Sequence, residues 1–252
     1  PEFASLNPFG TATTRGLDLS YPLLRNPLQN VNLALSYDDK QFDNTSNGTT
    51  SSYGIKVFNA SLNANQTDQW NGGGITNASV ALTTGDKNTE TRYNKLNLSL
   101  SRLQTLGDTT SAYAAFNIQQ ANRNLDSSEK MYLGGATGVR AYPASEAGGS
   151  DAHTLTLELR ERLAYNVTLT GFYDYGWVKA NHDNSVASPA NPNGYYLQGY
   201  GASLAWQATQ AVDFKATLAQ RIGDNPAASA LGNDSDGTQK ITRIWLSSGI
   251  AF

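Results

Sequence analysis

Two motifs of this chain hold side chains that could make a specific polar contact. Residues 133–143 form a glycine-rich segment with a single arginine, Arg140, and residues 171–176 hold a single aspartate, Asp174. A guanidinium and a carboxylate can share two parallel hydrogen bonds, which would hold a loop in register against a strand. By spacing alone, an unpaired surface arginine and an unrelated strand aspartate are the simpler interpretation.

Other chemistries find little support in the sequence. The glycine-rich segment lacks the Lys-Ser/Thr pair and the strand-to-helix setting of a phosphate-binding loop. His153 and His182 have aspartates nearby but no nucleophile elbow or metal-ligand spacing, so we expect both at the outer rim. Asp234 and Asp236 could suggest calcium, but a lone acidic cluster in a loop is usually a solvated turn. With no cysteine for a thiolate site, we predict no catalytic residue, no metal and no cofactor.

The elements around these motifs alternate apolar with polar residues, as β-strands do. In the last segment Ile244, Leu246 and Ile250 share one face, and the terminal Phe252 continues it. Further back, Leu155, Leu157 and Leu159 oppose Glu158 and Arg160, and Leu169, Tyr173 and Tyr175 oppose Phe172, Asp174 and Gly176. In a soluble sandwich the charged faces would be buried, and removing these charges from water would cost much free energy. A lipid face and a hydrated lumen avoid that cost, which favours a transmembrane antiparallel β-barrel.

We predict eleven strands, near residues 11–25, 29–43, 51–65, 75–85, 92–105, 109–121, 152–164, 166–181, 195–208, 210–222 and 239–252. Short periplasmic turns near 26–28, 106–108, 165 and 209 alternate with longer polar links at 44–50, 86–91, 122–151, 182–194 and 223–238. The link at 66–74 is too long for its place in this pattern. The alternation also slips at Val57-Phe58, which suggests a bulge.

Composition agrees with one large all-β domain over residues 1–252. Only 15% of the residues are charged, the net charge is −3, and mean hydropathy is −0.45, as expected where only one face of each strand meets lipid. No apolar run reaches the roughly 18 residues of a membrane-spanning helix. The scattered basic residues give no footprint for nucleic acid. Pro1-Glu2-Phe3 looks like a cloning remnant, so we expect the natural start upstream.

The chain resembles the transporters of two-partner secretion, the haemolysin secretion/activation family. The resemblance extends over nearly the whole chain, through residues 19–23, 125–129, 157–160, 221–226 and Phe252. Its most specific parts are Val139-Arg140-Ala141-Tyr142, similar to the family's Val-Arg-Gly-Tyr/Phe loop motif, and Phe172, Asp174 and Gly176, similar to its Phe-x-Asp-x-Gly strand motif. Ala141 stands where the family has glycine, and a positive φ there would strain it.

The resemblance implies a sixteen-stranded barrel preceded by periplasmic POTRA domains, of which this chain would hold the last eleven strands. Eleven is odd, whereas single-chain bacterial barrels have even strand numbers, so both arguments indicate missing strands. The first strand should then pair with the last or with a neighbour. The family's long sixth loop, here 122–151, should enter the lumen and dock Arg140 on Asp174.

The resemblance further implies a bacterial outer-membrane pore that exports an unfolded exoprotein in type V protein secretion and is not an enzyme. Its partners would be the exoprotein, outer-membrane lipid and the barrel-assembly machinery, which would read Phe252 as part of a signal. Glu158 and Arg160 would be lumen charges. A general diffusion porin would share the alternation and the terminal Phe but would have no reason for the Arg140 loop. A soluble carbohydrate-binding β-sandwich is the third reading.

Overall fold

The computed structural model describes residues 9–88, 92–184 and 192–251, and these residues build one large antiparallel sheet. Its eleven strands are β1 (Phe9–Arg25), β2 (Gln29–Ser46), β3 (Thr49–Asp68), β4 (Gly74–Lys87), β5 (Tyr93–Thr105), β6 (Thr110–Ala121), β9 (Asp151–Arg162), β10 (Val167–Lys179), β11 (Gly194–Gln207), β12 (Val212–Arg221) and β13 (Thr242–Ile250). All eleven segments expected from the alternation are strands, with ends that differ by a few residues. The expected face of Phe252 lies outside the described residues.

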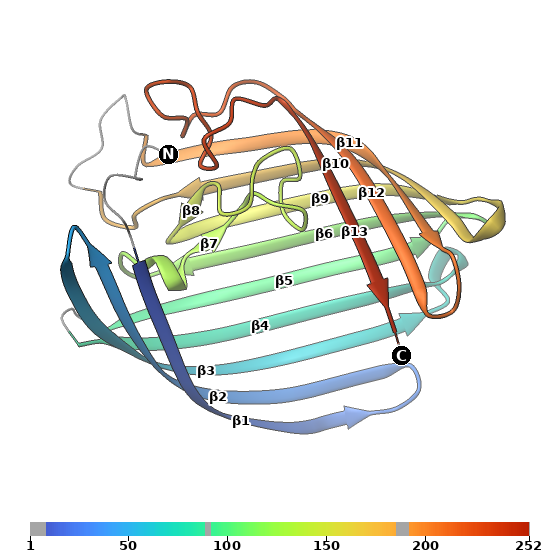
Figure 1. Ribbon diagram of the computed structural model, residues 1–252. Helices are drawn as coiled ribbons and strands as arrows, with labels where there is room; N and C mark the ends of the chain where they lie inside the picture. Colours follow the sequence, from blue (N-terminus) through green and yellow to red (C-terminus); the bar gives the residue numbers. More distant parts are fainter. Residues whose placement is uncertain (1–8, 89–91, 185–191, 252) are drawn as a thin grey trace.

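The strands follow one another in sequence order across the sheet, each antiparallel to its neighbours. Figure 1 shows the sheet curled into a deep trough, with the segment between β6 and β9 lying on its concave side. This segment contains two very short strands, β7 (Met131–Tyr132) and β8 (Gly148–Gly149), which pair with each other. The concave side is therefore the inner face of the sheet.

The two faces have opposite character, as the alternation predicts. Outward leucines of the later strands are exposed, for example Leu159 at 56% and Leu218 at 53%, whereas inward Asp174 and Ser203 are 1% and 4% exposed. An exposed apolar face around a polar interior is the reverse of a soluble protein. It matches a wall with lipid on one side and a lumen on the other, and it rules against the soluble sandwich.

Two connections are shorter than expected. The expected link at 44–50 is a hairpin in which Asn47 and Gly48 take positive φ values of 49° and 75°, the Asn-Gly turn that suits two-residue hairpins. The link at 66–74 shrinks because β3 continues to Asp68, and a 3₁₀ turn, η2 (Trp70–Gly72), leads into β4. That connection is a short turn and fits the predicted alternation of short and long links.

The bulge expected at Val57-Phe58 is absent, because β3 pairs without a shift from Thr49 to Gln66 on β2 and from Ile55 to Asp68 on β4. Val57 points inward and is 5% exposed, and Phe58 points outward and is 45% exposed. The alternation of β3 is interrupted in the sequence because the inner face of the sheet is apolar at the level of Val57. The register shift of the structure lies instead in β1, between Pro22 and Leu24.

Of the two pairings expected for the first strand, with the last strand or with a neighbour, the pairing with the last strand does not occur among the described residues. β1 and β13 are the two ends of the strand order, and no ladder joins them. Twist and coiling are set locally by each strand pair, so the sheet keeps an open arc. The backbone N–H and C=O groups along the free edges of β1 and β13 consequently have no strand partners in the described structure.

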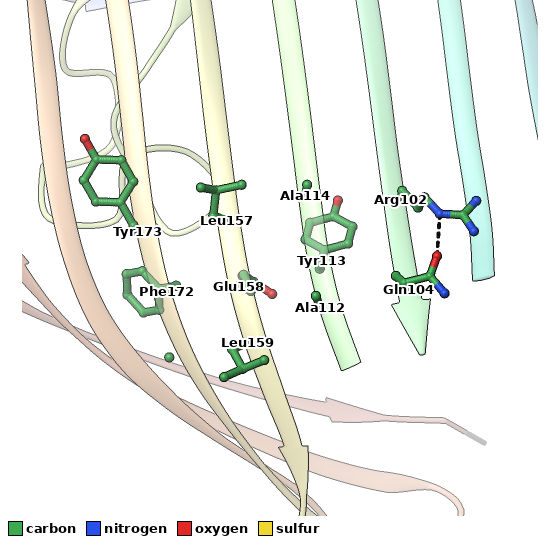
Figure 2. A pocket seen from close by; sticks show the side chains of 11 residues that line it. Arg102, Gln104, Ala112, Tyr113, Ala114, Leu157, Glu158, Leu159, Phe172 and Tyr173 are labelled. Carbon is green, nitrogen blue, oxygen red and sulfur yellow. Dashed lines mark hydrogen bonds between the residues drawn. The ribbon is translucent and has the colours of Figure 1, made fainter. Parts of the chain in front are cut away.

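The outer face is hollowed across β5, β6, β9 and β10, and Figure 2 shows the side chains around this hollow of about 560 Å³. Small residues, Ala112 and Ala114, line it on β6. Arg102 and Gln104 on β5 share a 2.8 Å hydrogen bond at its edge, drawn dashed in Figure 2. Arg102 also forms an ion pair with Asp68 at 2.8 Å. A matched ion pair near the end of β5 marks where the apolar outer band gives way to polar side chains.

Candidate functional site

The loop between β6 and β9 brings Arg140 onto the inner face of the sheet. Backbone bonds from Val139 to Leu133 and from Tyr142 to Val139, at 2.7 and 3.1 Å, fold its tip into a tight turn. Arg140 Nη2 and Nε donate to Asp174 Oδ1 and Oδ2, each at 2.8 Å, and the Arg140 backbone N–H donates to Oδ2 at 3.1 Å. The structure thus joins the two motifs by a bidentate, buried ion pair.

A second carboxylate completes the site around the guanidinium. Arg140 Nη1 lies 2.8 Å from Glu158 Oε1 on β9, and Glu158 Oε2 accepts from Arg160 Nε at 2.8 Å. Arg140 Cζ is 3.4 Å from the ring centroid of Phe172, and Arg160 stacks on Tyr113 at 4.6 Å. Burial alone would lower the pKa of Arg140, but Asp174 and Glu158 raise it above its ordinary value. The guanidinium is therefore held charged between two carboxylates and an aromatic ring.

Each residue of the strand motif has a separate physical task. Phe172 supplies the ring under Arg140, and Asp174 supplies the bidentate partner. Gly176 leaves room for the loop, because a Cβ there would lie 2.9 Å from Leu133 Cδ1 and 3.0 Å from Val139 Cγ2. One β-strand face thus presents a stacking surface, a charge and a gap at successive inward positions.

The loop motif is equally well accommodated. Ala141 is not among the residues with positive φ, so the strain considered for a non-glycine residue does not arise. Ala141 is 1% exposed and packs over Gly199 of β11. Tyr142 is fully buried, with Arg221 Cζ 5.4 Å from its ring centroid. Trp245 Nε1 on β13 donates to the Arg140 carbonyl at 2.8 Å, so the loop tip contacts strands from β9 to β13.

A second group of charges holds the start of the loop, and sequence reasoning missed it. Glu129 lies 2.7 Å from Lys40 Nζ and 2.9 Å from Lys95 Nζ, and Asp126 lies 3.1 Å from Lys87 Nζ. Burial would raise the pKa of Glu129, but the two lysines outweigh this and lower it. The segment 125–129 carried part of the family resemblance, so a signal existed, but no lysine partner was evident from the sequence.

An apolar cluster lies beside these charges. Its buried members are Ile55, Val57, Tyr93, Ala121 and Leu125, with Phe42 and Tyr53 packed against them. Four of the five buried members come from β3, β5 and β6, and Leu125 comes from the loop. The cluster explains why the alternation of β3 weakens near Val57, since the loop covers this part of the inner face.

The acidic residues considered as calcium ligands have arginine partners instead. Asp234 lies 2.8 Å from Arg221 Nη1 and 2.8 Å from Arg243 Nη2, and Asp236 lies 2.7 Å from Arg243 Nη1. The hydrogen bond to Arg243 lowers the pKa of Asp236 to about 2. No group of three or more metal-ligating side chains occurs in the parts of the chain that the structure describes.

The end of the loop also contacts this region. Glu146 is 2% exposed, and its two carboxylate oxygens accept from Asn225 Nδ2 at 3.0 Å and from the backbone N–H of Ser235 at 2.8 Å. Start, tip and end of the loop are therefore each held by carboxylates.

The two histidines do not form a common site. His153 points outward from β9 and stacks on Trp177 at 5.2 Å, in a row with Tyr175 and Phe116. His182 Nδ1 lies 2.9 Å from Asp151 Oδ2 beyond the end of β10. One is part of an outward aromatic belt, and the other fixes a connection at the rim. Within the described residues, no helix has the length and apolarity needed to traverse a membrane.

Comparisons with known proteins identify relatives of this chain. Residues 2–205 match the model of the family "Haemolysin secretion/activation protein ShlB/FhaC/HecB". The chain is 25% identical over 244 residues to the heme/hemopexin transporter protein HuxB of Haemophilus influenzae strain 86-028NP, covering 88% of this chain and 43% of the relative. This chain thus spans less than half of the length of that relative.

Solved structures show the same fold. CdiB from Escherichia coli superposes with a TM-score of 0.78 at 18% identity, covering 97% of this chain and 46% of that one. BamA from Haemophilus ducreyi lacking POTRA domains 1–3 superposes with a TM-score of 0.67 at 11% identity, covering 95% of this chain and 55% of that one.

Proposed function

Because this chain belongs to the haemolysin secretion/activation protein ShlB/FhaC/HecB family, we propose that it forms part of the wall of an outer-membrane pore that exports an unfolded exoprotein. The single observation that carries the proposal is the docking of Arg140 on Asp174 and Glu158. A sheet wall alone would fit any porin, whereas a long loop whose tip contacts the strands from β9 to β13 inside the sheet fits a regulated passage.

In this proposal the loop at 122–151 is a plug. Its polar anchors lie at Glu129, Arg140 and Glu146. The loop also has buried apolar contacts with the wall, among them those of Leu133, Val139 and Tyr142, so a chain that enters must replace both polar and apolar contacts for the plug to move as a unit. The exchange of these contacts for water and substrate drives opening without nucleotide hydrolysis, metal or cofactor.

Further parts of the protein complete the pore. We infer that five more strands and the periplasmic POTRA domains lie outside this chain, and that the POTRA domains recognise the exoprotein. Outer-membrane lipid contacts the outward leucines, and the barrel-assembly machinery reads a signal that includes Phe252. Members of the family are transporters, and the proposal assigns no reaction to this chain.

The test is export by the full-length protein. Its candidate exoprotein would be produced in a bacterial host with and without the full-length transporter, and the culture medium assayed for it. We expect the exoprotein in the medium only with the transporter, and in the periplasm without it. Small-solute uptake with no export would overturn the proposal in favour of a diffusion pore.

A further inference from the structure

The inner face of β2–β6 differs sharply from that of β9–β13. Four successive rows of inward residues cross β2, β3, β4, β5 and β6 in continuous register. From the periplasmic end they are Asn30, Asn65, Asn77, Ser101 and Ala115; Asn32, Asn63, Ser79, Ser99 and Asn117; Ala34, Ser61, Ala81, Asn97 and Gln119; and Ser36, Asn59, Thr83, Lys95 and Ala121. Nine of these twenty side chains are carboxamides. Lys95, which is ion-paired with Glu129, is the one charged side chain of these described positions.

This surface, which we call the amide face, is accessible in its lower two rows. Asn63, Asn65, Asn77 and Ser99 are exposed, and the sheet is hollowed here by a cavity of about 210 Å³. The loop makes its polar contacts with this half of the sheet higher up, at Lys40, Lys87, Lys95 and Gln119. The lower rows thus stay open beside the docked loop.

The side chains of the amide face are held by one another. Ser79 Oγ donates to Asn63 Oδ1 at 2.8 Å, and Asn30 Nδ2 donates to Asn65 Oδ1 at 3.1 Å. A carboxamide has two donor positions and an acceptor oxygen with two lone pairs. Asn63, with side-chain bonds to Ser79 and Ser61, and Asn65, with one to Asn30, therefore keep capacity for a ligand. The face therefore offers a dense, ordered array of neutral donors and acceptors.

That array matches one ligand better than others. An extended polypeptide presents a backbone N–H and a C=O at every non-proline residue whatever its sequence. Neutral amides can exchange hydrogen bonds with those groups without trapping acidic or basic side chains, and they give apolar side chains no surface to adhere to. The opposite half of the inner face, with its arginines and carboxylates, would discriminate by charge.

We propose that the amide face is the track along which the backbone of the exported polypeptide moves. The inference rests on the proposed function and adds to it the surface that the chain contacts. The two open rows offer neutral donors and acceptors of the same kinds, so a chain can advance along them without a preferred stop.

Single-cysteine crosslinking tests the track directly, since this chain contains no cysteine. The full-length transporter, with any other cysteine removed, would carry Asn63→Cys or Asn77→Cys. Thr168→Cys, inward on β10, is the matched control. An exoprotein with one cysteine and a folded C-terminal fusion would be stalled in transit. We expect disulfide crosslinks at positions 63 and 77 and few at 168. Crosslinks at 168 alone, with export intact, would overturn the track but not the pore.

Export by substituted transporters gives a second readout. Asn63→Leu with Asn77→Leu should lower exoprotein in the medium about fivefold, while Asn63→Ser with Asn77→Ser should stay within about twofold of the parent, because a hydroxyl keeps the hydrogen bonding that leucine removes. Both variants must reach the same membrane level of folded, heat-modifiable protein as the parent. Equal export by all three proteins would overturn the track, whereas no export by the parent would overturn the proposed function itself.

Discussion

Ala141 of the loop and Gly199 of β11 fit together as a methyl group over a bare backbone. A Cβ at Gly199 would lie 2.5 Å from Ala141 Cβ and 3.1 Å from the Gln220 carbonyl oxygen. The contact lies next to the Arg140 site, since Gly199 opposes Asp174 across β10 and β11. Because the loop motif has alanine at position 141, the loop can dock only if position 199 has no side chain.

Gly199→Ala should therefore loosen the loop. Overpacking of this kind costs about 1 to 3 kcal/mol, and we expect faster protease cleavage within 122–151 while the barrel stays heat-modifiable. Adding Ala141→Gly should restore part of the protection by removing the facing methyl. Gly171→Ala, outward on β10 with open space around it, is the control. Unchanged cleavage in Gly199→Ala would show that the contact does not position the loop.

Arg140→Ala should lower export while leaving the barrel folded. It removes the cation from two buried carboxylates, a change that costs about 3 to 5 kcal/mol for a buried pair, and this cost falls on loop docking. The exchange Arg140→Asp with Asp174→Arg should recover only part of the export, because the bidentate geometry and Phe172 favour arginine on the loop. If Arg140→Ala and Asp174→Ala both exported as much as the parent protein, the docked loop would have no part in the export mechanism.

The strands and their faces could be predicted from sequence because a period of two is a local signal. Leu155, Leu157 and Leu159 point outward as the alternation requires. Where the loop between β6 and β9 covers the inner face, the alternation fails, as at Val57. The Asn-Gly pair at Asn47-Gly48 is also a local signal, of a two-residue hairpin, which the expected link at 44–50 did not take into account.

The site could be predicted only in part. Arg140 and Asp174 were found because both belong to motifs, whereas Glu129 and its lysines were not. Lys40, Lys87 and Lys95 lie on three different strands, and only the register of the sheet brings them together. Residues that are distant in the sequence and meet only in the fold produce no periodic pattern in the sequence.

Charge on the outer face should be far less tolerated than on the inner face. Leu157→Arg or Leu204→Arg should destabilise the barrel by about 2 to 4 kcal/mol if the position is near the middle of the membrane. Lys215→Gln, inward on β12, should change the free energy of unfolding by less than about 0.5 kcal/mol. Urea titration of folding into lipid vesicles measures both. A reversed order would contradict the assignment of faces.

The last prediction concerns pH and the start of the loop. The pKa of Glu129 is lower in the folded protein than in the unfolded chain, because Lys40 and Lys95 outweigh burial. A depressed carboxyl pKa contributes stability that is present above the unfolded pKa, about 4.3, and is lost as pH falls through the folded value. Docking of residues 125–129 should therefore be constant from pH 7 to about 5 and weaken at lower pH. Hydrogen exchange of these backbone amides across that range, corrected for intrinsic exchange rates, measures the docking.

In the Glu129→Gln variant, residues 125–129 should be weakly docked at pH 7, and their docking should lose most of its pH dependence. Glu161→Gln, on the outer face of β9, should behave as the parent. The same acid response in the parent and in Glu129→Gln would assign the effect to other carboxylates, of which Asp126, paired with Lys87, is the nearest candidate.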